Sequence, residues 1–479
     1  MKKQPVFCAT VIGRNINDSI FLLMLCVALN SCSAQPIKTA NTKLEGSWIV
    51  HFTHRDIGTA RTSLTFEGNV ETFIAFSRKN ADRDILGRWY SFWGRLFTSS
   101  MNEGCLLRIE QGVHREINDT LHLAGIGVTP MGKFNVQGYV FADTLVATIS
   151  SKSRGALGAV NGYRGTVDES LENYAQLFDE IEQKTQDNIY NRTVLTTRKW
   201  NTFAKKMQNS TPKFQDDLEM VFAFFYRASK LPFSHYALMK PATNGDTSSR
   251  PSKPRLPSIV AQQNKGVALL RIPTFGGSAH AIDSVFDIII GEKYETLIVD
   301  LRNNTGGSVE AGMAFARNVI ERETYGGIFL TQKWFNENSS PPAPQDYVNF
   351  PHFSEANYDL IIEGIHNAEG ICLKIKPREK VFTGRMYVLI NNRTASTCEP
   401  IVYELKKSSR ATIVGETTSG SMLNGEPFLV GDGFTLFIPT ADYYASDGFR
   451  IDQNGVTPDV KAKCEEALEI ALRIINKNN

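Results

Sequence analysis

The chain has 479 residues, a formal net charge of +2, and 42% hydrophobic and 21% charged residues. This length predicts two or three domains, and the composition is that of a globular protein with sizeable cores. Because acidic and basic residues are mixed along the chain, the charge gives no reason to expect a nucleic-acid partner.

The N-terminus is typical of an export signal. Basic residues precede "IFLLMLCVAL", an apolar segment that is too short to span a bilayer comfortably. "LNSC" resembles a bacterial lipobox, which would make Cys32 the lipidated first residue of the mature protein. Ordinary signal-peptidase cleavage after Ala34 is the alternative. We therefore expect residues 1–34 to be a signal peptide. The mature protein would be periplasmic or at the outer membrane or cell surface, with a lipid anchor as its only membrane contact.

The remaining cysteines give no sign of a metal site. Cys105, Cys372, Cys398 and Cys464 are scattered, without CxxC or Cys/His ligand spacing. We expect no structural zinc, no other metal and no cofactor.

Residues 44–168 are predicted to be a β domain. Short, partly alternating apolar runs, from "GSWIVHFTH" to "TLVATISS", are separated by Gly, Asn and Asp. Their near-regular spacing predicts a closed barrel or a sandwich. Gly46, Ser47 and Trp48 resemble the Gly-x-Trp that begins lipocalin-type barrels. Two interpretations are open: a structural or docking domain whose Trp48 is only core, or a cup that binds an apolar ligand.

Residues 169–245 change to a helical period. Apolar side chains recur at helical spacing within 174–181, 200–207 and 218–228, which predicts a short bundle of three helices. Residues 246–258, rich in Pro, Ser and Lys, predict a linker.

Residues 259–479 alternate predicted strands and helices. "GVALLRI", "ETLIVDL", "RMYVLI" and "ATIVG" are predicted strands, and "SVEAGMAFARNVI" and "CEPIVYELKK" are predicted helices. "FTLFIP" and "GFRID" are predicted to form a late hairpin. The whole chain is thus predicted to be multidomain α+β, ending in an α/β core with a largely parallel sheet.

Three loops of this core are candidates for a functional site, because functional groups collect at the carboxyl ends of parallel strands. "LRNNTGG" ends in Gly306 and Gly307, whose amides could approach an oxyanion, although a plain glycine-rich turn is the alternative. "NNRTASTCEP" places Ser396 before a helix as a candidate nucleophile. A hydroxyl residue there is more often an N-cap, and Thr394 or Thr397 could do the same. "GETTSGS" is rich in small hydroxyls.

Taken together, "VDLRNNTGG", "NNRTASTCE", "RATIVGETTSG" and "NGVTPDV" resemble the core of the C-terminal-processing and tricorn peptidases, over about residues 265–462. The resemblance implies a crotonase-like, ββα-rich serine peptidase core with Ser396 as nucleophile and a peptide or unfolded protein as substrate. Tail-specific members use a Ser/Lys dyad, but Ser421 occupies the lysine position here, and no lysine lies between Arg410 and Val460. Too few residues separate "SHYAL" from the core to form the PDZ domain of those members.

Members resembling tricorn use a histidine base preceded by a serine, with an acidic residue near the C-terminus. The resemblance implies that Ser234 and His235 of "LPFSHYAL" take the first two roles. Asp452 of "FRIDQNGVTPD" takes the third, where the tricorn type has Glu. His235 would then accept the Ser396 proton and return it to the leaving amine.

The same resemblance implies an oxyanion hole made by the N–H groups of Gly306 and Thr397. Two alternatives are open. A catalytically inactive, peptidase-like binding protein is favoured by Ser421, by Asp452 and by Thr305, which stands where a glycine triplet usually begins. A surface lipoprotein whose β domain binds an apolar ligand is the other. The substrate and the oligomeric state do not follow from the sequence.

Overall fold

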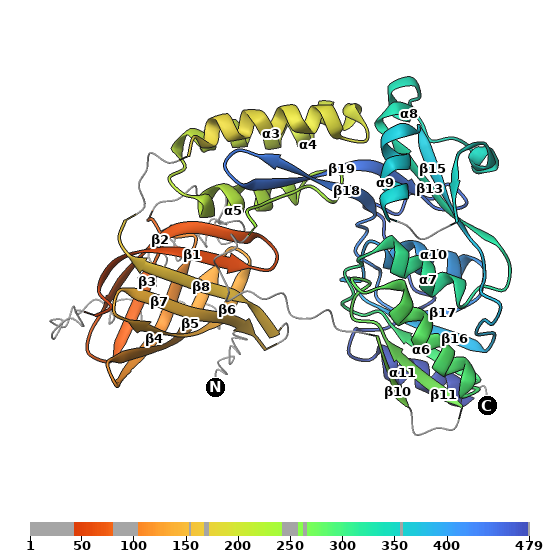
Figure 1. Cartoon of the computed structure of the whole chain (residues 1–479), viewed down its shortest axis with the longest axis horizontal. Helices are drawn as coiled ribbons and strands as arrows, with labels where there is room; N and C mark the ends of the chain where they lie inside the picture. Colours follow the sequence, from red (N-terminus) through yellow and green to blue (C-terminus); the bar gives the residue numbers. More distant parts are fainter. Residues whose placement is uncertain are drawn as a thin grey trace, which may run out of the picture.

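The computed structural model describes residues 43–79, 104–152, 155–166, 172–241, 257–261, 266–354 and 358–477. The predicted signal peptide and most of the predicted linker lie outside the described residues. Within the described ranges, no helix is long and apolar enough to cross a membrane. Figure 1 shows a β-barrel at one end of the molecule and an α/β body at the other, joined by a layer of helices and a long hairpin.

The N-terminal domain is a closed barrel of eight strands in chain order. They are β1 (Gly46–His54), β2 (Gly58–Gly68), β3 (Thr72–Phe76), β4 (Arg108–Ile117), β5 (Thr120–Thr129), β6 (Gly132–Phe141), β7 (Thr144–Ser151) and β8 (Gly155–Arg164). The glycines of β8 broke the apolar pattern, so this strand was not predicted. Trp48, Phe52, Phe66 and Phe134 belong to one buried cluster, and the rings of Phe52 and Phe134 lie 5.9 Å apart. Side chains thus fill the interior, which favours the structural interpretation of Trp48.

Three helices follow the barrel, as predicted: α3 (Tyr174–Asn188), α4 (Arg198–Ser210) and α5 (Asp217–Ala228). Short 3-10 turns, η2 (Arg192–Thr196) and η3 (Thr211–Lys213), flank α4. Asp216 caps α5 through the N–H of Glu219 and also accepts a hydrogen bond of 2.6 Å from Thr62 of β2. The helical layer is therefore anchored to the barrel by a buried polar contact.

The C-terminal body contains a sheet in the order β10-β11-β12-β16-β17-β20. Its strands are β10 (Ser258–Ala261), β11 (Val267–Arg271), β12 (Thr296–Asp300), β16 (Arg385–Ile390), β17 (Thr412–Gly415) and β20 (Val460–Lys461). From β11 onward, all neighbouring strands of this sheet run parallel, which confirms the predicted parallel sheet. One face packs on α6 (Ala279–Gly291), α7 (Val309–Arg317) and α10 (Cys398–Lys407), and the other on α11 (Ala467–Lys477).

A second sheet, in the order β14-β15-β13-β19-β18, was not predicted. Its strands are β14 (His352–Phe353), β15 (Gly370–Ile375), β13 (Thr324–Thr331), β19 (Phe434–Tyr444) and β18 (Leu423–Val430), and β9 (Ala237–Met239) pairs with β19. Helices α8 (Gln332–Glu337) and α9 (Tyr358–Asn367) and the turn η4 (Pro344–Asn349) border it.

The predicted hairpin of "FTLFIP" with "GFRID" is wrong. β19 pairs instead with β18, and "GFRID" contributes only an isolated bridge between Tyr444 and Arg450. Gly425 and Pro427 interrupt the apolar alternation of β18 and hid it from a pattern-based prediction. The β18–β19 hairpin reaches under α3, where Phe434 and Leu436 join the buried cluster of the barrel and helices (Figure 1).

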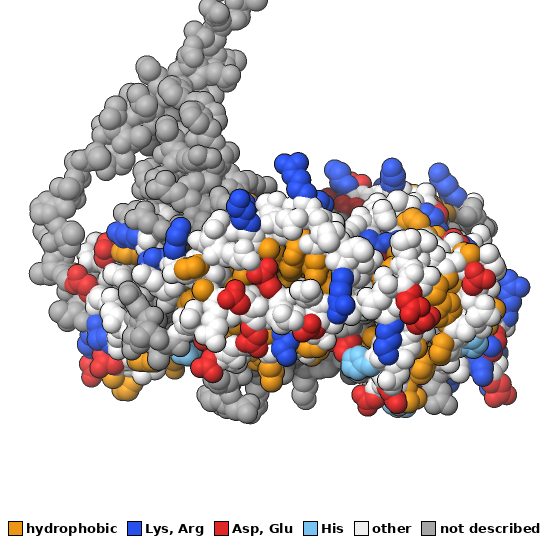
Figure 2. Space-filling view, turned by 90° about the horizontal axis from the view of Figure 1, so that it is seen from above, with side chains coloured by type: hydrophobic (Ala, Val, Ile, Leu, Met, Phe, Trp, Pro, Cys, Tyr) orange, Lys and Arg blue, Asp and Glu red, His pale blue; other side chains and the backbone are white. Residues whose placement is uncertain are grey.

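The hairpin and the helical layer together bring β9, and the residues just before it, against the C-terminal body. Figure 2 looks down on the α3 and α4 side of the molecule, where acidic and basic side chains are both present over the face. This distribution agrees with the small net charge of the sequence.

Candidate active site

Ser396 lies in the loop between β16 and α10, at the carboxyl edge of the parallel sheet. The three hydroxyl residues of this loop differ in what they contact. Thr394 Oγ1 donates to Leu301 O at 2.9 Å, and Thr397 Oγ1 donates to Gly307 O at 2.8 Å. Ser396 Oγ makes no hydrogen bond to the described residues, and its side chain is half-buried. Of the three, only the Ser396 hydroxyl is free to react.

The N-cap alternative for Ser396 receives no support from the geometry. The cap position of α10 is Thr397, and no side chain caps the helix there. Ser396 has a positive φ of 55°, a conformation that non-glycine residues rarely adopt. Its backbone N–H is held by Ser421 O at 3.1 Å and by Glu399 Oε2 at 3.0 Å. These two contacts hold the turn that presents the Ser396 side chain.

His235 lies between α5 and β9, two residues before β9 begins. Ser234 Oγ lies 2.8 Å from His235 Nδ1 and 2.5 Å from Asp452 Oδ1. An ionised carboxylate can only accept, so the single hydroxyl proton of Ser234 goes to Asp452. Ser234 Oγ must then accept the proton on His235 Nδ1. This leaves the Nε2 lone pair of His235 unprotonated, which is the tautomer that a general base requires.

The charge state of His235 fits the same role. Burial lowers the pKa of His235 below its ordinary range, and the nearby Asp452 carboxylate opposes that shift. The ring is therefore neutral at neutral pH. Like Ser396, His235 has a positive φ, of 57°, and the Cβ that an alanine would add at Gly425 of β18 would lie 3.2 Å from His235 Cβ. The hairpin thus packs closely against the histidine.

Asp452 has no solvent exposure and is held by several donors. Met422 N–H donates to its Oδ1 at 3.1 Å, and Arg450 Nη2 donates to its Oδ2 at 3.3 Å. Arg450 also forms a closer pair with Asp442, at 2.8 Å, whose pKa is raised by burial to about 6. The Arg450 guanidinium compensates both buried carboxylates, which lets Asp452 stay in place behind Ser234.

The loop of residues 418–422 contacts both the Ser396 loop and Asp452, which is hydrogen-bonded to Ser234 beside His235. Ser421 O accepts the Ser396 N–H, and the next residue, Met422, binds Asp452. No hydrogen bond joins Ser396 Oγ to His235. Catalytic hydrogen bonds are often long in enzymes without substrate and tighten only in the complex.

The backbone donors near Ser396 differ from the expected pair. Gly306 N–H donates to Asn304 Oδ1 at 2.9 Å, so it is already engaged. Gly307 N–H and Thr397 N–H make no hydrogen bond to the described residues. Gly306 has another role here: its φ is +91°, and an added Cβ would lie 2.7 Å from Ser396 Cβ. Only glycine allows this close approach.

Glu399 was not predicted from hydropathy or from the loop motifs. Its carboxylate is fully buried and ties the Ser396 loop to the 418–421 loop. The signal that could have revealed it is the Ser-x-x-Glu spacing of residues 396–399, which is typical of a carboxylate that returns to a backbone N–H at a helix start. Asn304 and Arg450 carried no comparable local signal, because their partners are distant in sequence.

No group of three or more His, Cys, Asp or Glu side chains in the described ranges could hold a metal ion. Cys105, Cys372, Cys398 and Cys464 are all free thiols.

Comparison with known proteins shows a similarity to peptidases over part of this chain. Residues 266–462 match the model of peptidase family S41. The chloroplastic C-terminal processing peptidase of Tetradesmus obliquus is 27% identical over 216 residues, which cover 45% of this chain and 39% of the relative. The carboxy-terminal processing protease CtpA of Bacillus subtilis is 34% identical over 86 residues, 18% of each chain. The solved structure of the tricorn protease has a TM-score of 0.42 and 11% identity, covering 92% of this chain and 55% of that one. The chain therefore matches less than half the length of the two curated relatives.

Proposed function

We propose that this protein, whose residues 266–462 match the model of peptidase family S41, cleaves peptide bonds in peptides or unfolded proteins. Ser396 would be the nucleophile and His235 the general base. The observation that carries the proposal is Ser234, which bridges His235 Nδ1 and Asp452 Oδ1 and so leaves His235 Nε2 able to accept a proton.

In the first step, Ser396 Oγ attacks the carbonyl carbon of the peptide bond while its proton moves to His235 Nε2. Asp452 stabilises the resulting imidazolium through Ser234. Thr397 N–H and Gly307 N–H, which make no hydrogen bond to the described residues, would hold the oxyanion, each contributing roughly 3–4 kcal/mol to transition-state stabilisation.

The tetrahedral intermediate then expels the amine, which takes the proton from His235 Nε2. The acyl group remains on Ser396 Oγ as an ester. In the second half, His235 removes a proton from a water molecule that attacks this ester, and the proton returns to Ser396 Oγ as the new carboxyl product leaves. No lysine is available between Arg410 and Val460 to act as the base instead.

Labelling with a fluorophosphonate serine probe tests the proposal. The wild type should be labelled, and both Ser396→Ala and His235→Ala should abolish labelling. Ser419→Ala is a matched control, since it removes an exposed hydroxyl from the adjoining loop, and it should be labelled like the wild type. A folded wild-type protein that takes up no probe and cuts no unfolded protein would favour the inactive binding protein instead.

We extend the proposal to export, which the N-terminal sequence supports. The intact mass of the mature protein distinguishes the two cleavage sites. A lipid-modified chain that begins at Cys32 is expected for the lipobox, and an unmodified chain that begins after Ala34 is expected for ordinary cleavage. Cys32→Ser should abolish the modification only in the first case.

A further inference from the structure

A cavity of about 540 Å³ lies between α7 and α10 and reaches the candidate active site. Thr397, the residue after Ser396, lines it, as does Met422, whose N–H donates to Asp452 Oδ1. The cavity therefore borders both the nucleophile loop and the segment that holds the acid. A substrate whose scissile carbonyl lies on Ser396 would have this space directly beside it.

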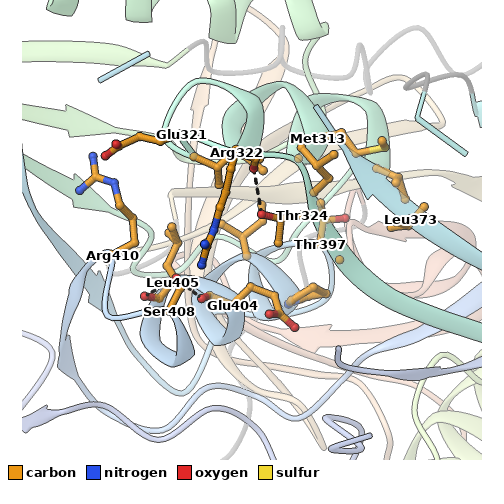
Figure 3. A pocket seen from close by; sticks show the side chains of 18 of the residues that line it. Met313, Glu321, Arg322, Thr324, Leu373, Thr397, Glu404, Leu405, Ser408 and Arg410 are labelled. Carbon is orange, nitrogen blue, oxygen red and sulfur yellow. Dashed lines mark hydrogen bonds between the residues drawn. The ribbon is translucent and has the colours of Figure 1, made fainter. Parts of the chain in front are cut away.

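The walls near Thr397 are apolar. They come from α7, from α10 and from the facing strands β13 and β15, and the apolar side chains include Val309, Met313, Ala316, Phe329, Leu373 and Ile401. Figure 3 shows Met313, Leu373 and Thr397 together at one side of the cavity, and Glu321, Arg322 and Arg410 toward the other. Along α10, Thr397 and the lining residue Ser408 are roughly 16 Å apart at 1.5 Å per residue. The charged side chains thus lie at the end far from Ser396.

Two half-buried charged side chains that line the cavity are already paired within the protein. Arg410 donates to the backbone oxygens of Val319, Phe382 and Gly384, and Glu404 accepts from the N–H and the hydroxyl of Ser446. A charged substrate side chain entering beside Thr397 would therefore lose its hydration and gain no partner, which is unfavourable. An apolar side chain would be favoured there because its surface leaves water.

On the basis of the proposed peptidase function, we propose that this cavity is the subsite for the substrate residue that adjoins the cleaved bond. It selects large apolar side chains such as those of Leu, Met and Phe. Filling an apolar pocket changes kcat/KM by about 10- to 200-fold between side chains that differ in size. The preference should therefore be at least about 10-fold for leucine over alanine at this position.

Cleavage of a peptide library prepared from a digested proteome, read by mass spectrometry, tests the inference. A large apolar residue should be enriched on one side of the cleaved bonds. Two peptides made around the best-cut sequence, with leucine or alanine at that position, then give a ratio of kcat/KM values. Ala316→Phe, which fills the cavity from α7, should lower this ratio by about 10-fold or more.

Ala156→Phe, the same substitution at an exposed position of β8 in the barrel, is the control and should keep the wild-type ratio. Circular dichroism during heating checks that Ala316→Phe is folded. If it is not, Met313→Ala, which enlarges the cavity, should shift the preference toward Phe and Trp.

The outcomes separate the two proposals. A wild type that is labelled at Ser396 and cuts peptides, but whose preference is unchanged by either cavity variant, overturns the subsite and leaves the peptidase standing. Cleavage next to charged residues as often as next to large apolar ones would also overturn the subsite but not the peptidase function. A wild type with neither labelling nor cleavage overturns both.

Discussion

Replacing Glu399 by glutamine should disturb the site without touching any reacting atom. Glu399 Oε1 accepts hydrogen bonds from Thr418 Oγ1 at 2.6 Å and from Gly420 N–H at 2.8 Å. Its Oε2 accepts from Ser396 N–H at 3.0 Å and from Ser421 N–H at 2.9 Å. Burial raises the pKa of Glu399, and these four donors oppose that shift. All four partners donate, so only an acceptor with two oxygens satisfies them.

Glutamine keeps one oxygen and turns the other acceptor into an N–H₂ donor. Two of the four bonds would be lost, and the buried N–H groups or hydroxyl left behind would face another donor. A hydrogen bond to a charged group contributes about 1.5–3 kcal/mol, so Glu399→Gln should cost about 3–6 kcal/mol of local stability. That is a large part of the 5–15 kcal/mol or so that stabilises a typical domain. A misplaced Ser396 should also react about 100-fold more slowly.

Two measurements check this prediction: the thermal unfolding temperature and the rate at which the fluorophosphonate labels Ser396. Glu416→Gln is the matched control, because Glu416 begins the same loop and its side chain makes no hydrogen bond to the described residues. It should change neither quantity. The reasoning would be refuted if Glu399→Gln unfolded at the same temperature as this control and labelled within twofold of its rate.

Three further predictions concern the buried groups His235 and Asp216 and the close approach of Gly306 to Ser396. Because burial lowers the pKa of His235, kcat/KM should rise with pH and level off with a midpoint below its ordinary value of about 6.5; a higher midpoint would count against His235 as the base. Gly306→Ala places a Cβ 2.7 Å from Ser396 Cβ and should slow probe labelling about 100-fold, whereas labelling at the wild-type rate would mean that the loop can move aside. Burial raises the pKa of Asp216 to about 7, so the folded state keeps a proton that the unfolded chain releases at about pH 3.9. Its stabilisation is then complete below about pH 4 and is lost as the pH rises to about 7, and Asp216→Asn should flatten the unfolding temperature across that window, which a pH series of melting curves would check.

The strands and helices that flank the candidate site in the C-terminal body were predictable because hydropathy reports burial. The fully buried runs of β12 and β16 read as strands, and the apolar stripe of α10 reads as a helix. The three helices after the barrel and the parallel sheet were predictable for the same reason. β8 and β18 were not, because glycine and proline within them break the alternation while their backbones still pair.

The candidate site was predictable only as a set of residues. Ser396, His235 and Asp452 were nominated through ordered motifs, but hydrogen bonding separated Ser396 from its neighbouring threonines, whose hydroxyls are engaged with backbone carbonyls. In the same way, Gly306 and Gly307 are equivalent in sequence. Only the position of the Asn304 side chain decides that the first N–H is engaged and the second is free.

By itself, the sequence determined most strands of the β domain, the three helices after it and the central strands of the parallel sheet, because burial and period show in the pattern of neighbouring residues. It also showed that Ser421 stands where tail-specific peptidases have a lysine, and that no lysine lies between Arg410 and Val460. The tertiary structure alone decided how the site is assembled. Ser234 and Asp452 are 218 residues apart, and their hydrogen bond sets the tautomer of His235. Hydrogen bonds depend on positions to within a few tenths of an ångström, and only packing of the hairpin, the helices and the sheets against one another fixes those positions.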